Sequence, residues 1–296
     1  MKRGAVVLVA HGSVDRLDDL PAFLTNIRRG QPPPEALVAE LRHRYEAIGG
    51  SPLNAINRRL AEKLERALGV PVRVANRLWA PYPEHVLAEL DADFVVALPL
   101  AQHSSHVYAQ ALAERASVPV KAIENWGQTP ALLDAFAVRV RAALPASLPA
   151  RDVGLVLSAH SLPKAVIDAG DPYEREVRAS AAGVASRVRD VLPDVWVAFQ
   201  SQGMSKGPGG RPMEWLGPDL PATLDAVAAA GKKHVVLAPI GFLADHVEIL
   251  YDIDIEAKRL AAERGLSLSR TESLDDADDF VAILADLVRP ALAEAT

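Results

Sequence analysis

Short apolar runs rich in β-branched residues alternate along this chain with longer segments of helical spacing, and this alternation constrains the fold most. The runs begin near Ala5, Val72, Asp93 and Val118 in the first half, and near Val153, Asp194, Lys233 and Leu266 in the second. Because parallel strands need a long crossover connection, the alternation predicts parallel sheets covered by helices on both faces. Four strands in each half predict two similar α/β domains.

The boundary between the two domains is expected in a proline-containing linker at residues 115–150. We assign residues 1–118 to the N-terminal domain and residues 119–276 to the second domain. A last helix is predicted over residues 278–289, where Pro290 ends it, and is expected to pack on the N-terminal domain. The spacing of apolar residues predicts further helices at residues 36–47, 57–68 and 179–191.

Residues 14–56 depart from this alternation of strands and helices, because they separate the first strand from the helix that returns to the sheet. They contain one predicted helix, which begins at Ala36 between the turn-rich stretches NIRRGQPPPE and IGGSPL. A connection this long with little secondary structure of its own is usually functional. We therefore expect residues 14–56 to form a ligand-binding insertion.

Composition excludes several classes of protein. The net charge of −6 offers no basic face to nucleic acid, so an anionic ligand must be met by a local group of arginines. The absence of cysteine excludes disulfides, thiolate-bound zinc, Cys-ligated iron–sulfur clusters and a cysteine nucleophile. No apolar stretch reaches the ~20 residues of a membrane helix, and the N-terminal apolar run is shorter than a secretory signal. We expect a soluble, cytoplasmic protein.

Five of the eight histidines follow predicted strands, and they are His11, His103, His106, His160 and His246. Open α/β sheets bind ligands at the carboxyl ends of their strands. A single histidine there is more often a hydrogen-bonded loop residue than a ligand. Five at equivalent ends favour a shared site.

The segment after His246 adds carboxylates at helical spacing. Glu248, Asp252 and Glu256 follow one another at i, i+4 and i+8, which predicts a single column on a helix, with Asp254 on the solvent side. A solvated acidic stripe is the ordinary interpretation of such a column. The apolar neighbours favour a channel or buried site instead, and they are Val247, Ile249, Tyr251, Ile253 and Ile255. Carboxylate and imidazole ligands together suit iron, zinc or manganese.

Five motifs in sequence order carry a family resemblance. They are GGSPL at Gly49–Leu53, SAHSLP at Ser158–Pro163, GDPY at Gly170–Tyr173, WLGPDL at Trp215–Leu220 and GFLADHVEILYDID at Gly241–Asp254. Together they resemble the ferrochelatase family, in particular its short bacterial members, which insert Fe²⁺ into a porphyrin to make haem. The resemblance runs nearly end to end. It implies two Rossmann-like domains, each with a four-stranded parallel sheet, and an active-site cleft between them.

The resemblance also implies roles for individual residues. His160 matches the family's metal- and proton-handling histidine, Glu248 the acid that faces it, and Asp252 and Glu256 the acidic file that leads metal or protons to the site. The residues implied to contact the porphyrin are Arg28, Arg29, Arg44, Tyr45, Ser51 and Ser201. The expected substrates are Fe²⁺ and a porphyrin, with no further cofactor and no iron–sulfur cluster. We expect a monomer that makes transient contacts with neighbouring enzymes of haem synthesis.

The chain departs from the family at His11, where the short bacterial enzymes carry tyrosine and the mitochondrial enzymes methionine. His11 would then face the metal from the other side of the porphyrin. The loop at residues 205–212 also looks longer than in near relatives. Coproporphyrin III and protoporphyrin IX both remain possible substrates, and the NIRRG stretch favours the former. Two alternatives stay open: a chelatase of sirohydrochlorin-like rings, indicated by His11 before Gly12 and Ser13, and a non-catalytic haem- or porphyrin-binding protein.

Overall fold

The computed structural model of the chain describes residues 2–202 and 213–294, so the loop at residues 205–212 lies outside the described residues. The chain divides into two compact units. Unit 1 comprises Met1–Trp126, Leu243–Val247 and Leu274–Thr296, and unit 2 comprises Gly127–Phe242 and Glu248–Ser273. The division falls after Trp126 rather than after residue 118, because the fourth strand pairs with the sheet of unit 1.

Unit 1 is built on a four-stranded parallel sheet in the order β2-β1-β3-β4. The strands are β1 (Gly4–Ala10), β2 (Val72–Asn76), β3 (Phe94–Pro99) and β4 (Val120–Ala122). Strands β1 and β3 lie at the centre and are apolar throughout, as strands covered on both faces must be. The predicted parallel sheet of four strands is confirmed.

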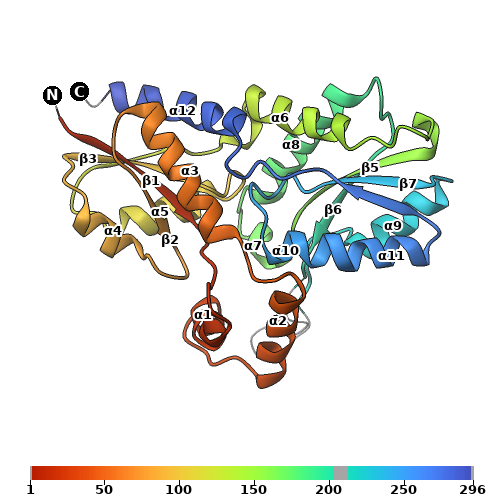
Figure 1. Cartoon of the computed structure of the whole chain (residues 1–296), viewed down its shortest axis with the longest axis horizontal. Coiled ribbons are helices and arrows are strands. Elements are labelled where there is room, and N and C mark those ends of the chain that lie inside the picture. Colours follow the sequence, from red (N-terminus) through yellow and green to blue (C-terminus); the bar gives the residue numbers. More distant parts are fainter. Residues whose placement is uncertain (1, 203–212, 295–296) are drawn as a thin grey trace. The chain divides into compact units, whose positions relative to one another are not determined.

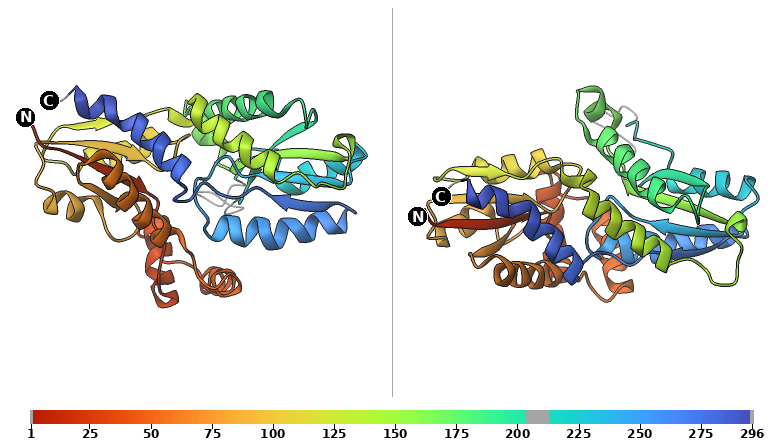
Figure 2. Two further views of the ribbon diagram at one scale, coloured as in Figure 1. Left: turned by 45° about the horizontal axis from the view of Figure 1, so that its top comes forward. Right: turned by 90° about the horizontal axis from the view of Figure 1, so that it is seen from above.

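Helices cover both faces of this sheet. Helix α12 (Asp278–Ala293) packs against α3 (Leu53–Leu68), and both views of Figure 2 show the blue α12 beside the orange α3. The other face carries α4 (Pro83–Glu89) and α5 (Ser105–Ala113). The predicted end of the last helix at Pro290 is wrong, since α12 continues to Ala293. The φ of proline is helical, and one lost hydrogen bond in the last turns does not stop a packed helix.

The insertion after β1 contains a 3₁₀ turn, η1 (Leu17–Asp19), and two helices, α1 (Leu20–Ile27) and α2 (Glu35–Ala47). Figure 1 shows α1 and α2 lying beyond the carboxyl end of β1. Sequence pattern predicted only the second helix. Helix α1 escaped because Pro21 looks like a helix breaker, although proline at the first positions of a helix is compatible with it. Val14, Leu20, Phe23 and Tyr45 form the small core of the insertion.

Unit 2 repeats the plan of unit 1, with a parallel sheet in the order β6-β5-β7-β8. The strands are β5 (Val153–His160), β6 (Val195–Gln200), β7 (His234–Ala238) and β8 (Ser267–Arg270). One face carries α6 (Pro130–Ala142) and α8 (Tyr173–Val188), and the other carries α9 (Leu220–Ala229), α10 (Val247–Leu250) and α11 (Lys258–Glu263). The short elements are η2 (Trp126–Gln128), η3 (Ala150–Asp152) and α7 (Lys164–Asp168).

The two sheets share one strand order, so β1 and β5 hold equivalent central positions. His160 is the last residue of β5, and His11 directly follows β1. A histidine therefore stands at the carboxyl end of the first strand in each unit.

The acidic segment is not one regular α-helix. Between α10 and α11 lies a π-helical turn, η5 (Asp252–Ala257), in which the amides of Ile255 and Glu256 both bond to the carbonyl of Tyr251. The extra residue in this turn rotates the side chains that come after it around the helix axis. Ile255 is exposed, whereas the carboxylate of Asp254 is half-buried and lies 2.9 Å from Nη2 of Arg270. The prediction that Asp254 marks the solvent side is wrong, because its carboxylate is half-buried against Arg270.

Among residues 2–202 and 213–294, no helix is long and apolar enough to cross a membrane.

Candidate active site

His160 ends a strand that is buried along its whole length, and several contacts fix its main chain. It lies opposite Gln200 of β6 in the parallel register, and the amide of Ser161 donates to the Gln200 carbonyl at 2.7 Å. The hydroxyl of Tyr173, from the GDPY motif, donates to the His160 carbonyl at 2.8 Å. The motif residues Ser161 and Tyr173 thus hold the backbone that presents the imidazole.

The turn after His160 is held by the WLGPDL motif, which is distant in sequence. The amide of Leu216 donates to the Leu162 carbonyl at 2.9 Å, and Pro163 and Trp215 form an antiparallel bridge. The buried hydroxyl of Ser161 donates to the Leu216 carbonyl at 2.9 Å. The SAHSLP and WLGPDL motifs therefore form one structural element around the catalytic candidate.

The imidazole of His160 faces the carboxylate of Glu248, with Nδ1 of the histidine 3.1 Å from Oε2 of the glutamate. Each side chain is about one third exposed, at 35% and 32%. Burial acts to lower the pKa of His160, but the charges of Glu248 and Asp252 and the hydrogen bond to Glu248 outweigh it, so the pKa is raised above its ordinary value. This histidine is poised to accept and hold a proton.

The other predicted acidic residues are both half-buried: Asp252 begins the π-helical turn, and Glu256 is its last residue but one. The hydroxyl of Ser201 donates to Oδ2 of Asp252 at 2.6 Å, and Ser201 takes a left-handed φ of 60°. Ser201 therefore supports the acidic segment, and its predicted contact with the porphyrin stays a prediction. Within the described residues, no three His, Asp or Glu side chains are grouped to hold a metal ion.

In unit 1, His11 is exposed just after the carboxyl end of β1. Its Nδ1 lies 3.3 Å from the hydroxyl of Tyr108, and its ring meets the ring of Phe23 edge-on, with centroids 6.2 Å apart. The guanidinium of Arg77 lies over the Tyr108 ring, 5.6 Å from its centroid. The contacts of His11 thus include aromatic groups, where His160 has a carboxylate.

Apart from His11, the predicted porphyrin contacts of unit 1 lie in the insertion. Arg28 and Arg29 form the turn after α1, Arg44 lies in the last turn of α2, and Ser51 follows α2. The Arg44 guanidinium is engaged by Glu40 at 2.6 Å.

Tyr45, the remaining predicted contact, is only 2% exposed, and its hydroxyl lies 2.9 Å from that of Ser13. It belongs to the core of the insertion, so any effect on a porphyrin is indirect in this conformation.

The five histidines after strands do not share one environment. His11, His103, His106 and His246 belong to unit 1, and His160 belongs to unit 2. His103 is buried, and burial lowers its pKa to about 3. Nδ1 of His246 lies 2.9 Å from the Ala244 carbonyl, which can only accept, so this nitrogen carries the proton. His103 is a neutral core residue, so it does not belong to the predicted site of five histidines.

Similarity to known proteins decides the family. The family model for ferrochelatase matches residues 3–292 of the chain. The chain belongs to the ferrochelatase family. A ferrochelatase of Acidobacterium capsulatum is 38% identical over 319 residues, which cover 98% of this chain and 95% of that protein. A coproporphyrin III ferrochelatase of Geobacillus kaustophilus is 34% identical over 316 residues, covering 99% of this chain and 97% of that protein.

Solved structures support the fold of this ferrochelatase-family chain. A multi-domain Deinococcus radiodurans protein with structural similarity to chelatases superposes with a TM-score of 0.56 at 18% identity, and the match covers 97% of this chain. This chain spans 55% of the length of that protein. CbiX, the terminal enzyme of sirohaem biosynthesis in denitrifying bacteria, gives a TM-score of 0.53 at 15% identity and covers 98% and 99% of the two chains. At these identities the likeness concerns the fold alone.

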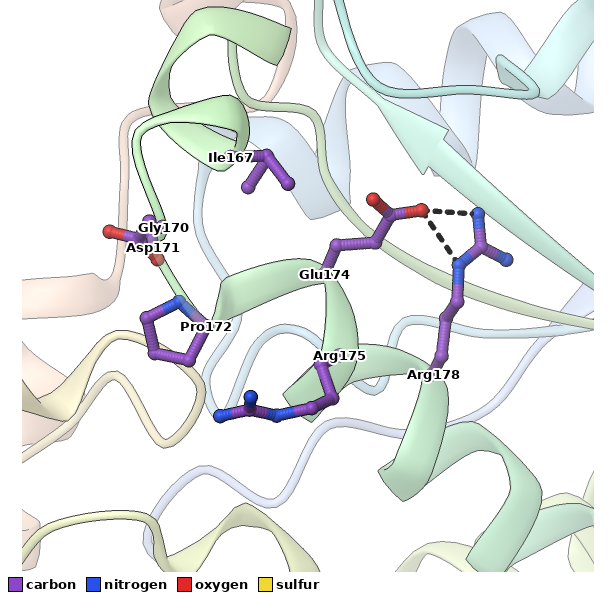
Figure 3. A pocket seen from close by; sticks show the side chains of 7 residues that line it. All are labelled: Ile167, Gly170, Asp171, Pro172, Glu174, Arg175 and Arg178. Atoms are coloured by element: carbon purple, nitrogen blue, oxygen red, sulfur yellow. Dashed lines mark hydrogen bonds and ion pairs between the residues drawn. The ribbon is translucent and has the colours of Figure 1, made fainter.

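A surface pocket of about 520 Å³ in unit 2 lies beside the GDPY motif of this ferrochelatase-family chain. Figure 3 shows two of its charged side chains facing one another, with Nε of Arg178 2.8 Å from Oε1 of Glu174. Asp171 accepts a hydrogen bond from the amide of Tyr173 at 2.9 Å. The pocket contains neither His160 nor Glu248. Its side chains Asp171, Glu174 and Arg178 make hydrogen bonds within the protein.

Two polar residues near the site were not predicted. Asn54 of α3 accepts a bond from the Ser13 amide and donates to the Ser13 carbonyl, which fixes the turn after His11. Gln200 bonds to both Ser158 and Glu248. Asn54 directly follows the GGSPL motif, and this position was its only signal in the sequence. Gln200 had the signal of a polar residue that ends an apolar strand.

Proposed function

We propose that this chain inserts Fe²⁺ into a free-base porphyrin with release of two protons, as a lyase of haem biosynthesis. The observation that supports the proposal is the His160–Glu248 pair at the carboxyl end of β5, 3.1 Å apart, in a chain of the ferrochelatase family. Proton removal and metal delivery both need groups of these types, since a porphyrin loses its inner N–H protons when a dication enters.

His160 is the proposed proton acceptor. In the neutral imidazole a proton on Nδ1, which lies 3.1 Å from Oε2 of Glu248, would leave the lone pair on Nε2 for a pyrrole N–H. After proton transfer, the imidazolium is stabilised by Glu248 and by the charge of Asp252. The raised pKa of His160 expresses this stabilisation, and it is the driving force for the first deprotonation.

Delivery of iron is the proposed role of the carboxylates of unit 2. Glu248 begins the acidic segment, and Asp252 and Glu256 continue it through the π-helical turn. Carboxylate oxygens bind Fe²⁺, and a metal that is a substrate must also leave its ligands. A series of separate carboxylates, rather than a closed group of three or more ligands, suits a substrate that has to be passed on.

The porphyrin proposed for this site is coproporphyrin III. Arginine forks recognise carboxylates, and Arg28, Arg29 and Arg44 supply three guanidinium groups on one insertion. Coproporphyrin III carries more propionates than protoporphyrin IX, so it makes fuller use of these groups. Relatives in Geobacillus kaustophilus and Bacillus subtilis, 34% and 31% identical, are named coproporphyrin III ferrochelatases.

A second candidate, chelation of a sirohydrochlorin-like ring, is favoured by one observation. His11 stands at the end of β1, at the place that corresponds to His160 in unit 2, and could act on a metal in the same way. The more highly carboxylated sirohydrochlorin would also be bound by the arginines of the insertion.

One experiment separates these candidates. The purified chain is mixed anaerobically with Fe²⁺ or Zn²⁺ and with coproporphyrin III, protoporphyrin IX or sirohydrochlorin, and insertion is followed through the loss of ring fluorescence or the change in absorbance. We expect insertion into coproporphyrin III to be fastest. Faster insertion into sirohydrochlorin would favour the second candidate, and binding of every ring without insertion would leave a porphyrin-binding protein.

A further inference from the structure

Two buried polar side chains lie under the His160–Glu248 pair. Ser158 of β5 is fully buried and Gln200 of β6 is 3% exposed, in a sheet whose interior is otherwise largely apolar. The Ser158 hydroxyl lies 2.7 Å from Oε1 of Gln200, and Nε2 of Gln200 lies 3.3 Å from the main-chain carbonyl of Glu248. The bonds join two strands to the first turn of the acidic segment.

The direction of both bonds follows from chemistry. A carbonyl can only accept, so the Glu248 carbonyl must meet the NH₂ end of the Gln200 amide. The amide oxygen then faces Ser158, whose hydroxyl must donate. A reversed amide would place two acceptors against each other in a buried site, which is strongly unfavourable. The pair therefore has one stable arrangement.

The same three strand positions share one face of the sheet. Ser158 and His160 are two residues apart on β5, so their side chains project to the same side, and Gln200 is paired with His160 across the parallel ladder. Ile249, the residue after Glu248, is buried in the apolar core on this face, together with Val156 and Ala198. Gln200 thus contacts the main chain of the residue whose carboxylate faces His160.

We propose that Gln200, oriented by Ser158, is the positioning residue that holds Glu248 against His160. The inference rests on the proposed function for its effect on metal insertion, but not for its effect on His160. A side-chain carboxylate follows its own backbone, and the Glu248 backbone is fixed to the strands by this amide. Groups of this kind, which hold a reacting side chain without touching the substrate, typically change activity about 10- to 100-fold when they are removed.

The test replaces the amide by two variants of similar size. Gln200→Leu and Gln200→Met both remove the two hydrogen bonds without adding a charge beside His160, and methionine keeps nearly the length of glutamine. The first readout is the pKa of His160, followed by NMR of histidine-labelled protein without metal or porphyrin and assigned with His160→Gln. We expect the pKa to fall in both variants, because the carboxylate that raises it is no longer held in place.

The second readout is metal insertion. We expect kcat to fall about 10- to 100-fold in both variants while the KM for porphyrin stays nearly unchanged, since the substrate does not touch Gln200. Ser180→Ala is the matched control: it removes another buried hydroxyl of unit 2, which donates to the Gly127 carbonyl at 2.9 Å. This control is expected to lose stability but to keep the His160 pKa and kcat.

The outcomes distinguish the two proposals. An unchanged His160 pKa in folded Gln200→Met would overturn the positioning role, whatever the activity. If the wild type inserts no metal but the pKa falls in the variants, the proposed function fails and the positioning role stands. Should Gln200→Leu fail to fold, Gln200→Met and Ser158→Ala decide the question, because Ser158→Ala releases the amide without altering its size.

Discussion

The ends of β1 and β5 are equivalent places in two similar sheets, and each is followed or ended by a histidine. Around His160 the chain places the carboxylate of Glu248 and the charge of Asp252. Around His11 it places the phenol of Tyr108 and the ring of Phe23. The same strand ending therefore has two different surroundings, and the difference comes from the elements that pack beside it.

The difference also appears in how the two backbones are fixed. Tyr173 and the partner strand hold the main chain of His160, so the imidazole is presented from a rigid strand. The turn after His11 is held by Asn54, a residue of the helix that follows the insertion. Any movement of the insertion can therefore reach His11, whereas His160 depends on the sheet of unit 2.

Removal of the His160 imidazole is expected to have the largest effect on activity. His160→Ala should lower the rate of metal insertion by about 10²- to 10⁴-fold, the range typical of a general base, while the Kd for porphyrin stays close to that of the wild type. Rates are measured by fluorescence loss and binding by titration under the same anaerobic conditions. His11→Ala is the matched variant, and an equal loss in both would abolish the contrast between the two strand ends.

Replacing His103 tests how burial alone changes the pKa of a histidine and, through that pKa, the stability of the fold. Its folded pKa is about 3 and its unfolded pKa is about 6.5. Between these pH values the unfolded chain binds a proton at His103 and the folded chain does not. The stability that this neutral histidine contributes is present above pH 6.5 and is lost as the pH falls toward 3, by at most about 5 kcal/mol. Urea unfolding between pH 7 and pH 4 should therefore depend less on pH in His103→Leu than in the wild type. Equal slopes would show that His103 titrates normally.

Neutralising Glu248 should move His160 toward the behaviour of an ordinary histidine. In Glu248→Gln the charge that raises the His160 pKa is gone, so the pKa falls and the acidic limb of the pH–rate profile shifts to lower pH. We expect kcat to fall about 10- to 100-fold, because the imidazolium loses its partner. A profile that keeps its acidic limb at the wild-type pH would show that Glu248 does not control this proton.

The same pKa shift also affects the stability of the fold. Because the folded pKa of His160 is raised, its ion pair stabilises the fold fully below the unfolded pKa near 6.5, and this contribution is lost as the pH rises through the folded pKa. The sign is opposite to that of His103. Since His160 is about one third exposed, the contribution is small compared with that of His103.

Much of the fold was predictable because it depends on local pattern. Apolar runs that end at Ala10 and His160 are buried on both faces, and a parallel order follows from the crossovers between them. His160 and Glu248 were predicted from the motifs that carry the family resemblance, and their chemical roles stay predictions. That the two side chains face one another depends on packing distant in sequence, and only the family resemblance indicated it.

The features that escaped prediction depend on non-local contacts. In the sequence, Gln200 is one more polar residue at a strand end. Its role depends on a hydrogen bond to the Glu248 carbonyl, which lies 48 residues later in the chain. The π-helical turn leaves no mark in the spacing of the carboxylates, and within it Ile255 is exposed while Asp254 is half-buried against Arg270. One extra residue in a turn is decided by packing against the sheet, and a charge pattern cannot report it.

The smallest expected effect concerns the link between His11 and Tyr108. Their hydrogen bond, at 3.3 Å, is long and joins a phenol to an exposed imidazole, so its loss in Tyr108→Phe should cost no more than about 1 kcal/mol, or less than about sixfold in insertion rate. A double-mutant cycle with His11→Phe measures whether the two residues act together. If His11 faces the metal, Tyr108→Phe should slow insertion in the wild-type background and have no effect once His11 is replaced. Additive effects would separate the two residues and leave His11 as a packed residue of the turn, with the metal chemistry confined to the end of β5.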